Sequence, residues 1–257
     1  EASLDAVTTG SDNTAVGDNA GGATTTGNNN VAVGSSSLLV NTTGADNVAV
    51  GYLALDANTT GASNTAVGSG ALGANTDANN NTAIGTDALD ANTTGHSQTA
   101  VGVNALGANT TANHNVAVGN NSLLVNTTGA QNTAVGSTAL DANTTANDNT
   151  AVGYSALTAN TTGTYNVAVG STTLGGNTTT SGNTAVGFYA LKVATATNNS
   201  AFGGDALQKT TTGGYNTAVG HSALVENTTG TYNVAVGATA LDANTTGANN
   251  TAIGYDT

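Results

Sequence analysis

The chain has 257 residues, of which 38% are hydrophobic and 7% are charged, and its formal net charge is −13 at pH 7. This balance argues against nucleic acid and anionic membrane surfaces as partners, because both require clustered Lys and Arg. The lack of cysteine excludes disulfides and thiolate metal sites. The sequence also lacks methionine and any long apolar run, so we expect that Glu1 is not a translation start and that any targeting segment lies outside this sequence.

A five-residue word, Asn-[Thr/Val]-Ala-[Val/Ile/Phe]-Gly, recurs fifteen times; one copy begins with Gln, and another has Ser as its second residue. The first copy begins at Asn13 and the last at Asn250, and successive copies are 17 residues apart, except that Asn183 and Asn199 are 16 apart. We number the repeat from 1 to 17, starting at this Asn. The flanking residues fit the same numbering, so we predict one repeat domain over residues 1–257.

Each copy predicts a short coil of β-structure. Thr-Ala-Val at positions 2 to 4 is a β-branched run that stops at Gly, which indicates a strand followed by a turn. Asn-Thr-Thr-Gly at positions 12 to 15 indicates a second strand or a corner, where Gly supplies a positive φ. Such a unit is too short for a helical hairpin and contacts only its neighbours. The sequence therefore predicts an all-β fold, a β-solenoid (parallel β-roll) of about fifteen 17-residue coils.

Stacked coils place like residues above one another at a spacing of about 4.8 Å. We expect Asn at positions 1 and 12 to form hydrogen-bonded ladders, as amides do in cross-β stacks. An inward-facing Asn is therefore the preferred interpretation of the Asn-Thr-Thr sequons, ahead of glycosylation. Asp at position 10, as in Asp56 and Asp90, never occupies consecutive copies, which keeps like charges from facing each other.

Position 3 is Ala in every copy. Alternation along a strand places positions 2 and 4 on one side and position 3 on the other. If Val at position 4 faces the core, the Ala residues face outward, and we expect a second chain to cover them. The alternative is that Ala fits a tight place inside the coil. The predicted self-association face consists of Ala15, Ala32, Ala49, Ala66, Ala83, Ala100, Ala117, Ala134, Ala151, Ala168, Ala185, Ala201, Ala218, Ala235 and Ala252.

The consensus N-T-A-V-G-x-x-A-L-x-A-N-T-T-G resembles the head repeat of trimeric autotransporter adhesins of the YadA-like type, and repeats of phage-like tail fibres. The resemblance covers the whole chain and is strongest at Ala15–Gly17, Ala83–Gly85 and Ala252–Gly254. It implies a left-handed parallel β-roll, often three chains around an axis, with surface display and a role in adhesion or in a structural fibre. The repeat here is longer than the family's usual coil, and the sequence contains no neck, stalk or anchor.

We recognise no catalytic constellation, and we expect no enzyme activity, cofactor or metal. The three histidines fall in different coils, with no carboxylate at a repeated spacing. One region departs from the repeat, because residues 183–215 contain the missing residue, both lysines and both phenylalanines. Either Phe fills space left in the core by the deletion, or the region is a contact patch whose lysines meet acidic residues. The residues of this irregular patch are Phe188, Tyr189, Lys192, Phe202 and Lys209.

Three functions are consistent with these patterns. The first, which we favour, is a structural subunit of an extracellular or cell-surface filament. Its partner is the chain itself, through the Ala face and through ends that lie mid-coil without a polar cap, with no direct insertion into a membrane. The second is an adhesin or tail-fibre head fragment, a parallel trimer that binds a host-surface ligand. The third is an ice-binding solenoid with a Thr row at position 14, although a T-x-T pattern is not kept.

Overall fold

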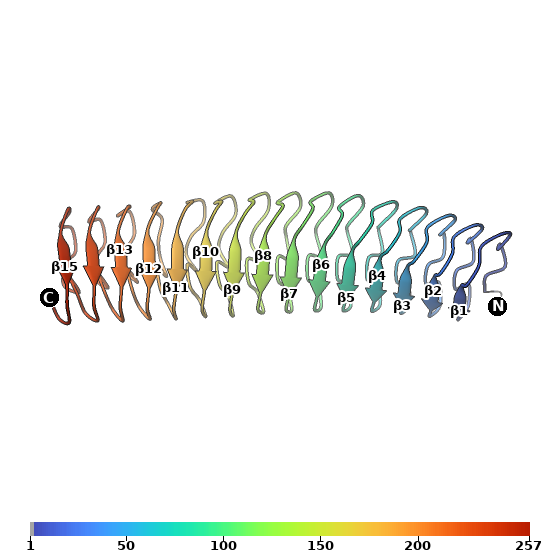
Figure 1. Ribbon diagram of the computed structural model, residues 1–257, viewed down its shortest axis with the longest axis horizontal. Helices are drawn as coiled ribbons and strands as arrows, with labels where there is room; N and C mark the ends of the chain where they lie inside the picture. Colours follow the sequence, from blue (N-terminus) through green and yellow to red (C-terminus); the bar gives the residue numbers. More distant parts are fainter. Residues whose placement is uncertain (1–2) are drawn as a thin grey trace. The chain divides into compact units, whose positions relative to one another are not determined.

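The computed structural model describes residues 3–257, and they form an all-β fold in which every coil contributes one short strand (Figure 1). No helix occurs within this range. The strands are β1 (Thr14–Val16), β2 (Val31–Val33), β3 (Val48–Val50), β4 (Thr65–Val67), β5 (Thr82–Ile84), β6 (Thr99–Val101), β7 (Val116–Val118), β8 (Thr133–Val135), β9 (Thr150–Val152), β10 (Val167–Val169), β11 (Thr184–Val186), β12 (Ser200–Phe202), β13 (Thr217–Val219), β14 (Val234–Val236) and β15 (Thr251–Ile253).

The chain divides into two compact units, the first ending at Gln131 and the second comprising Asn132–Thr257. The first unit contains β1 to β7, the second contains β8 to β15, and within each unit every strand pairs in parallel with the strand of the next coil. Each unit is therefore a parallel β-solenoid of 17-residue coils, which confirms the predicted fold. The expectation that residues 1–257 form a single domain stays a prediction.

Equivalent repeat positions face each other throughout the described pairings. Ala49 lies opposite Ala66, and Ala185 lies opposite Ala201 although their copies are 16 residues apart. The register survives the short copy because the missing residue is position 14, at an exposed corner. Thr195 makes the hydrogen bond typical of position 13, because its hydroxyl donates to the carbonyl of Thr211 in the next coil. Ala196 takes the place of position 15, because its carbonyl accepts a hydrogen bond from Nδ2 of Asn183.

The coil of residues 47–63 shows why the turns require their residues. Gly51 follows the strand with a φ of 137°, and a Cβ there would lie 2.5 Å from the carbonyl oxygen of Gly68 in the next coil. Neither this conformation nor this space admits a side chain, which explains why position 5 is always Gly. The Asn-Thr-Thr segment forms a corner rather than a second strand, and the N–H of Thr59 donates to the carbonyl of Thr76 in the next coil.

The interior of each unit is lined by Ala and Leu rather than by Val. In the coil of residues 47–63, Ala49, Ala54 and Leu55 at positions 3, 8 and 9 are all buried. Val50 at position 4 is only half-buried, because it lies on the outer side of the sheet. Leu at position 9 and Asn at positions 1 and 12 already fill the narrow interior, so a methyl group is all that fits at position 3.

The predicted outward Ala face is therefore wrong. The strand Ala residues from Ala32 to Ala235 are at most 2% exposed within their own chain, and Ala15 and Ala252, in the first and last strands, are half-buried. The alternative, that Ala fits a tight place inside the coil, is confirmed. No second chain can cover these side chains, because the coil itself covers them.

Candidate functional site

Two buried asparagines in each regular coil converge on a single carbonyl group. In the coil of residues 47–63, Nδ2 of Asn47 donates to the carbonyl oxygen of Gly61 at 2.8 Å, and Nδ2 of Asn58 donates to the same oxygen at 3.0 Å. This bridge closes the coil across its interior. It also satisfies a carbonyl that would otherwise be buried without a partner, which would cost stability.

The same amides join consecutive coils into the predicted ladders. Nδ2 of Asn58 donates to Oδ1 of Asn41 at 2.9 Å, and the backbone N–H of Asn64 donates to Oδ1 of Asn47 at 3.0 Å. These side chains are fully buried, so the sequon asparagines of regular coils point inward in the folded chain. The structure thus confirms the ladder interpretation of these asparagines.

The ladder at position 12 is interrupted where the sequence lacks Asn. Ala194 has no amide to offer, and Thr24 and Thr210 are buried with hydroxyl groups that find no hydrogen-bond partner in the described chain. The Thr side chain is one atom too short to place a donor where the Asn amide bridges to position 15. These are the weak points of an otherwise fully bonded interior.

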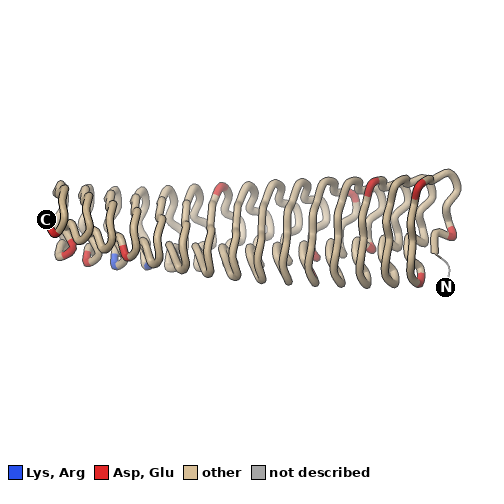
Figure 2. The backbone as a smooth tube through the Cα atoms, turned by 60° about the horizontal axis from the view of Figure 1, so that its bottom comes forward, with Lys and Arg blue, Asp and Glu red and all other residues tan. Residues whose placement is uncertain are grey.

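The outer side of each sheet presents the first and last residues of every strand, which we call the Thr/Val face. Position 4 is Val, Ile or Phe in all fifteen strands, position 2 is Thr, Val or Ser, and none of these residues is charged. The charged residues lie instead on the bends of the coils (Figure 2). An apolar surface that continues from coil to coil is the kind of feature that marks an interaction site.

The irregular patch does not form one cluster, and neither Phe fills the core. Phe188 is 52% exposed and contacts Tyr189, with ring centroids 3.8 Å apart, and Nζ of Lys192 lies 4.0 Å from the Tyr189 ring centroid. Phe202 is 41% exposed on the Thr/Val face. Lys209 does meet an acidic residue, because its Nζ lies 2.6 Å from Oε1 of Glu226.

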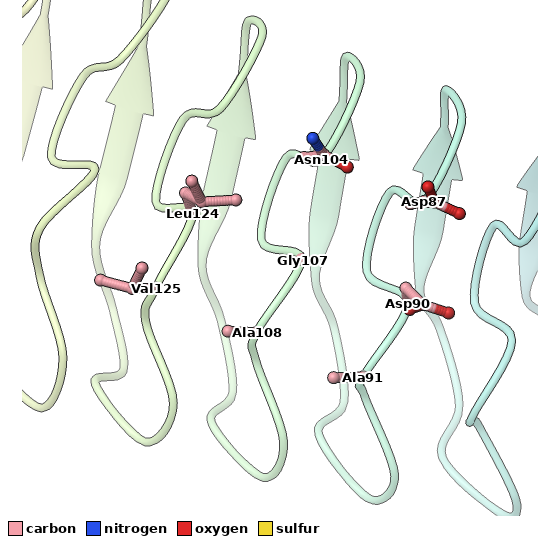
Figure 3. A pocket seen from close by; sticks show the side chains of 8 residues that line it. All are labelled: Asp87, Asp90, Ala91, Asn104, Gly107, Ala108, Leu124 and Val125. Atoms are coloured by element: carbon pink, nitrogen blue, oxygen red, sulfur yellow. The ribbon is translucent and has the colours of Figure 1, made fainter.

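An open hollow of about 520 Å³ in the first unit is lined by Asp87, Asp90 and Ala91 of one coil and by residues of the next two coils, including Asn104 and Val125 (Figure 3). Burial raises the pKa of Asp90 above its ordinary value, and the carboxylates of Asp87 and Asp56 raise it further. Burial also raises the pKa of Asp56. Across residues 3–257, no group of three or more His, Asp or Glu side chains is arranged to hold a metal ion.

A smaller hollow of about 340 Å³ lies in the second unit, and we call it the Tyr/Thr hollow. The rings of Tyr215 and Tyr232 stack beside it, with centroids 5.0 Å apart and planes inclined by 9°. This hollow was not predicted from the sequence, although Tyr at position 17 of two consecutive copies beside the deletion was a usable signal. It is lined by Thr195, Ala196, Thr197, Thr212, Gly214, Tyr215, Thr231 and Tyr232.

The parallel strands, the invariant register and the buried amide ladders define the chain as a β-solenoid repeat protein. A comparison with family models, curated proteins and solved structures finds no match. A search of residues 3–257 for a helix long and apolar enough to cross a bilayer finds none.

Proposed function

We propose that the chain is a structural subunit of an extracellular filament and that its function is the assembled solenoid. The observation that carries this proposal is the Thr/Val face, whose last strand residue is apolar in all fifteen copies although it points out of the coil. Stacking disfavours Lys or Glu in consecutive copies, and strands favour β-branched residues, but neither effect excludes an occasional charge or a Ser or Thr at a solvated position. A covered position excludes a charge in every copy, because an unpaired charge in an interface is costly.

The Thr/Val face of each unit offers a strip for side-by-side contact between copies. Seven or eight strands about 4.8 Å apart, each about three residues of about 3.3 Å long, give roughly 350 Å² for each unit. One strip is about half of the ~800 Å² that each partner contributes to a stable interface, so a stable assembly needs each copy to make more than one such contact. The chain carries a net charge of −13, so copies repel one another elsewhere, and this charge-free face is where they can approach.

The test is a charge placed on the Thr/Val face of each unit. We expect the wild-type chain to sediment as oligomers and the double variant Val50→Glu, Val152→Glu to sediment as smaller species with the same circular dichroism. The matched control is Val40→Glu, Val193→Glu, which places the same charges at residues that are 39% and 40% exposed but lie outside the face. Equal sedimentation of the two double variants would refute the role of the face.

The ice-binding alternative, which rests on the Thr row at position 14, stays a prediction. The threonines of this row, such as Thr43 and Thr60, are exposed, and Asp77 interrupts the row. The neighbouring Thr at position 13 is not free for ice, because the hydroxyl of Thr42 donates to the carbonyl of Thr59 at 3.0 Å and other Thr at this position repeat the bond. The adhesin-head alternative stays a prediction.

A further inference from the structure

The Tyr/Thr hollow lies beside the break in the repeat. The copy at residues 183–198 lacks position 14, the exposed corner residue that its neighbours supply as Thr179 and Thr212. In the next copy Gly214 adds no side chain, and a Cβ there would lie 3.0 Å from the carbonyl oxygen of Thr197. A missing corner residue and a glycine therefore both border this recess.

Two stacked tyrosines border the recess. Because their rings are almost parallel in consecutive coils, the face of Tyr215 turned away from Tyr232 is turned toward the preceding coil, which carries Thr197. The two side chains are 52% and 56% exposed, so each ring is held in place by its neighbour while part of it remains open to a ligand. A pre-ordered ring loses little conformational freedom on binding, which favours affinity.

Hydroxyl groups surround the rings, and no charged residue lines the recess. The hydroxyls of Thr212 and Thr231 make no hydrogen bond to the described part of the chain, so both are available to a ligand. A hydroxyl can donate one hydrogen bond and accept two. The lining therefore combines an apolar ring face with neutral groups that both donate and accept.

We propose that the Tyr/Thr hollow binds a neutral saccharide. The C–H face of a sugar ring matches the exposed ring surface of Tyr215, and the sugar hydroxyls match those of Thr212 and Thr231. A charged saccharide or peptide finds no counter-charge here. A proline-rich peptide fits less well, because it needs a slot between splayed aromatic residues, and these two rings lie flat against each other. The proposal is independent of whether the chains form filaments.

The experiment measures binding of cellotetraose, maltotetraose and chitotetraose to the full chain by saturation-transfer NMR, followed by calorimetry of any that bind. We expect at least one of these saccharides to bind, and Tyr215→Ala to weaken that binding about tenfold or more through loss of the stacking surface. Insertion of Thr between Thr195 and Ala196 restores the 17-residue copy and should weaken binding by filling the recess. Circular dichroism confirms that each variant is folded.

The matched control is Tyr165→Ala, which removes a Tyr that is 66% exposed at the same repeat position but outside the hollow. This variant should bind as the wild-type chain does. The proposal is overturned if none of the three saccharides binds, if Tyr165→Ala weakens binding as much as Tyr215→Ala does, or if only a proline-rich peptide binds.

Discussion

Replacing Asn58 with Ala tests whether the interior amides hold the coils together. The side chain makes three hydrogen bonds, to Oδ1 of Asn41 at 2.9 Å, to the carbonyl of Gly61 at 3.0 Å, and from Nδ2 of Asn75 at 2.9 Å. Gly61 keeps its bond from Asn47, whereas Oδ1 of Asn41 loses this donor. At about 1 kcal/mol for each bond, with a further penalty for the acceptor that loses its donor, the variant should lose about 3–4 kcal/mol of stability.

The loss should be local, because each coil of a solenoid contacts only its neighbours. Hydrogen exchange measured by mass spectrometry should show faster exchange for peptides covering residues 41–78 and unchanged exchange in the second unit. The matched control is Thr60→Ala, two residues away at an exposed corner, which should change stability by less than about 0.5 kcal/mol. Indistinguishable urea midpoints and exchange patterns for the two variants would refute the ladder argument.

Three further substitutions test other parts of the account. Thr210→Asn should raise the urea midpoint by restoring a bond to the carbonyl of Gly213, worth about 1–2 kcal/mol, and a lower midpoint would contradict this. Gly51→Ala should cost about 3 kcal/mol or prevent folding, because its φ is 137° and the new Cβ meets Gly68; wild-type circular dichroism and melting would contradict it. Asp90→Asn should stabilise the chain at pH 7 but not at pH 3. Because the pKa of Asp90 in the folded chain is raised above its ordinary value of 3.8, the wild-type chain loses stability as the pH rises above 3.8, whereas the Asn variant does not. A difference in melting temperature between the two proteins that is the same at pH 3 and pH 7 would contradict this.

Much of the fold follows from the sequence because the repeat constrains it at every level. The invariant Gly at position 5 marks the end of each strand, and the 17-residue spacing sets a register that the pairing of Ala49 with Ala66 reproduces. The Asn ladders also follow, since a stacked amide has its best partner in the next coil. Even the short copy keeps this register, because its missing residue belongs to an exposed corner.

The side of the sheet that faces inward could not be read from the repeat. Alternation separates Ala49 from Val50 but does not say which one is inside. Hydrophobicity favoured Val, whereas the space left beside Leu55 and the two asparagines admits only Ala. The Tyr/Thr hollow was missed for a related reason, because it depends on side chains from three coils that meet around a deletion.

With Ala inside the coil, the apolar residues at position 4 form the outward row of each sheet. The Ala residues inside the coil need no partner, so the proposed assembly rests on the outward residue at position 4, which is Val, Ile or Phe in every strand. A Val side chain offers more apolar surface to a partner than a methyl group does.

Static light scattering of the purified chain at rising concentration, with negative-stain electron microscopy of the same samples, tests the proposed function most directly. We predict masses that grow well beyond the 24.5 kDa of one chain, and uniform filaments on the grid. A mass of one chain at every concentration, with no filaments, would contradict the account of this solenoid as an assembling fibre subunit.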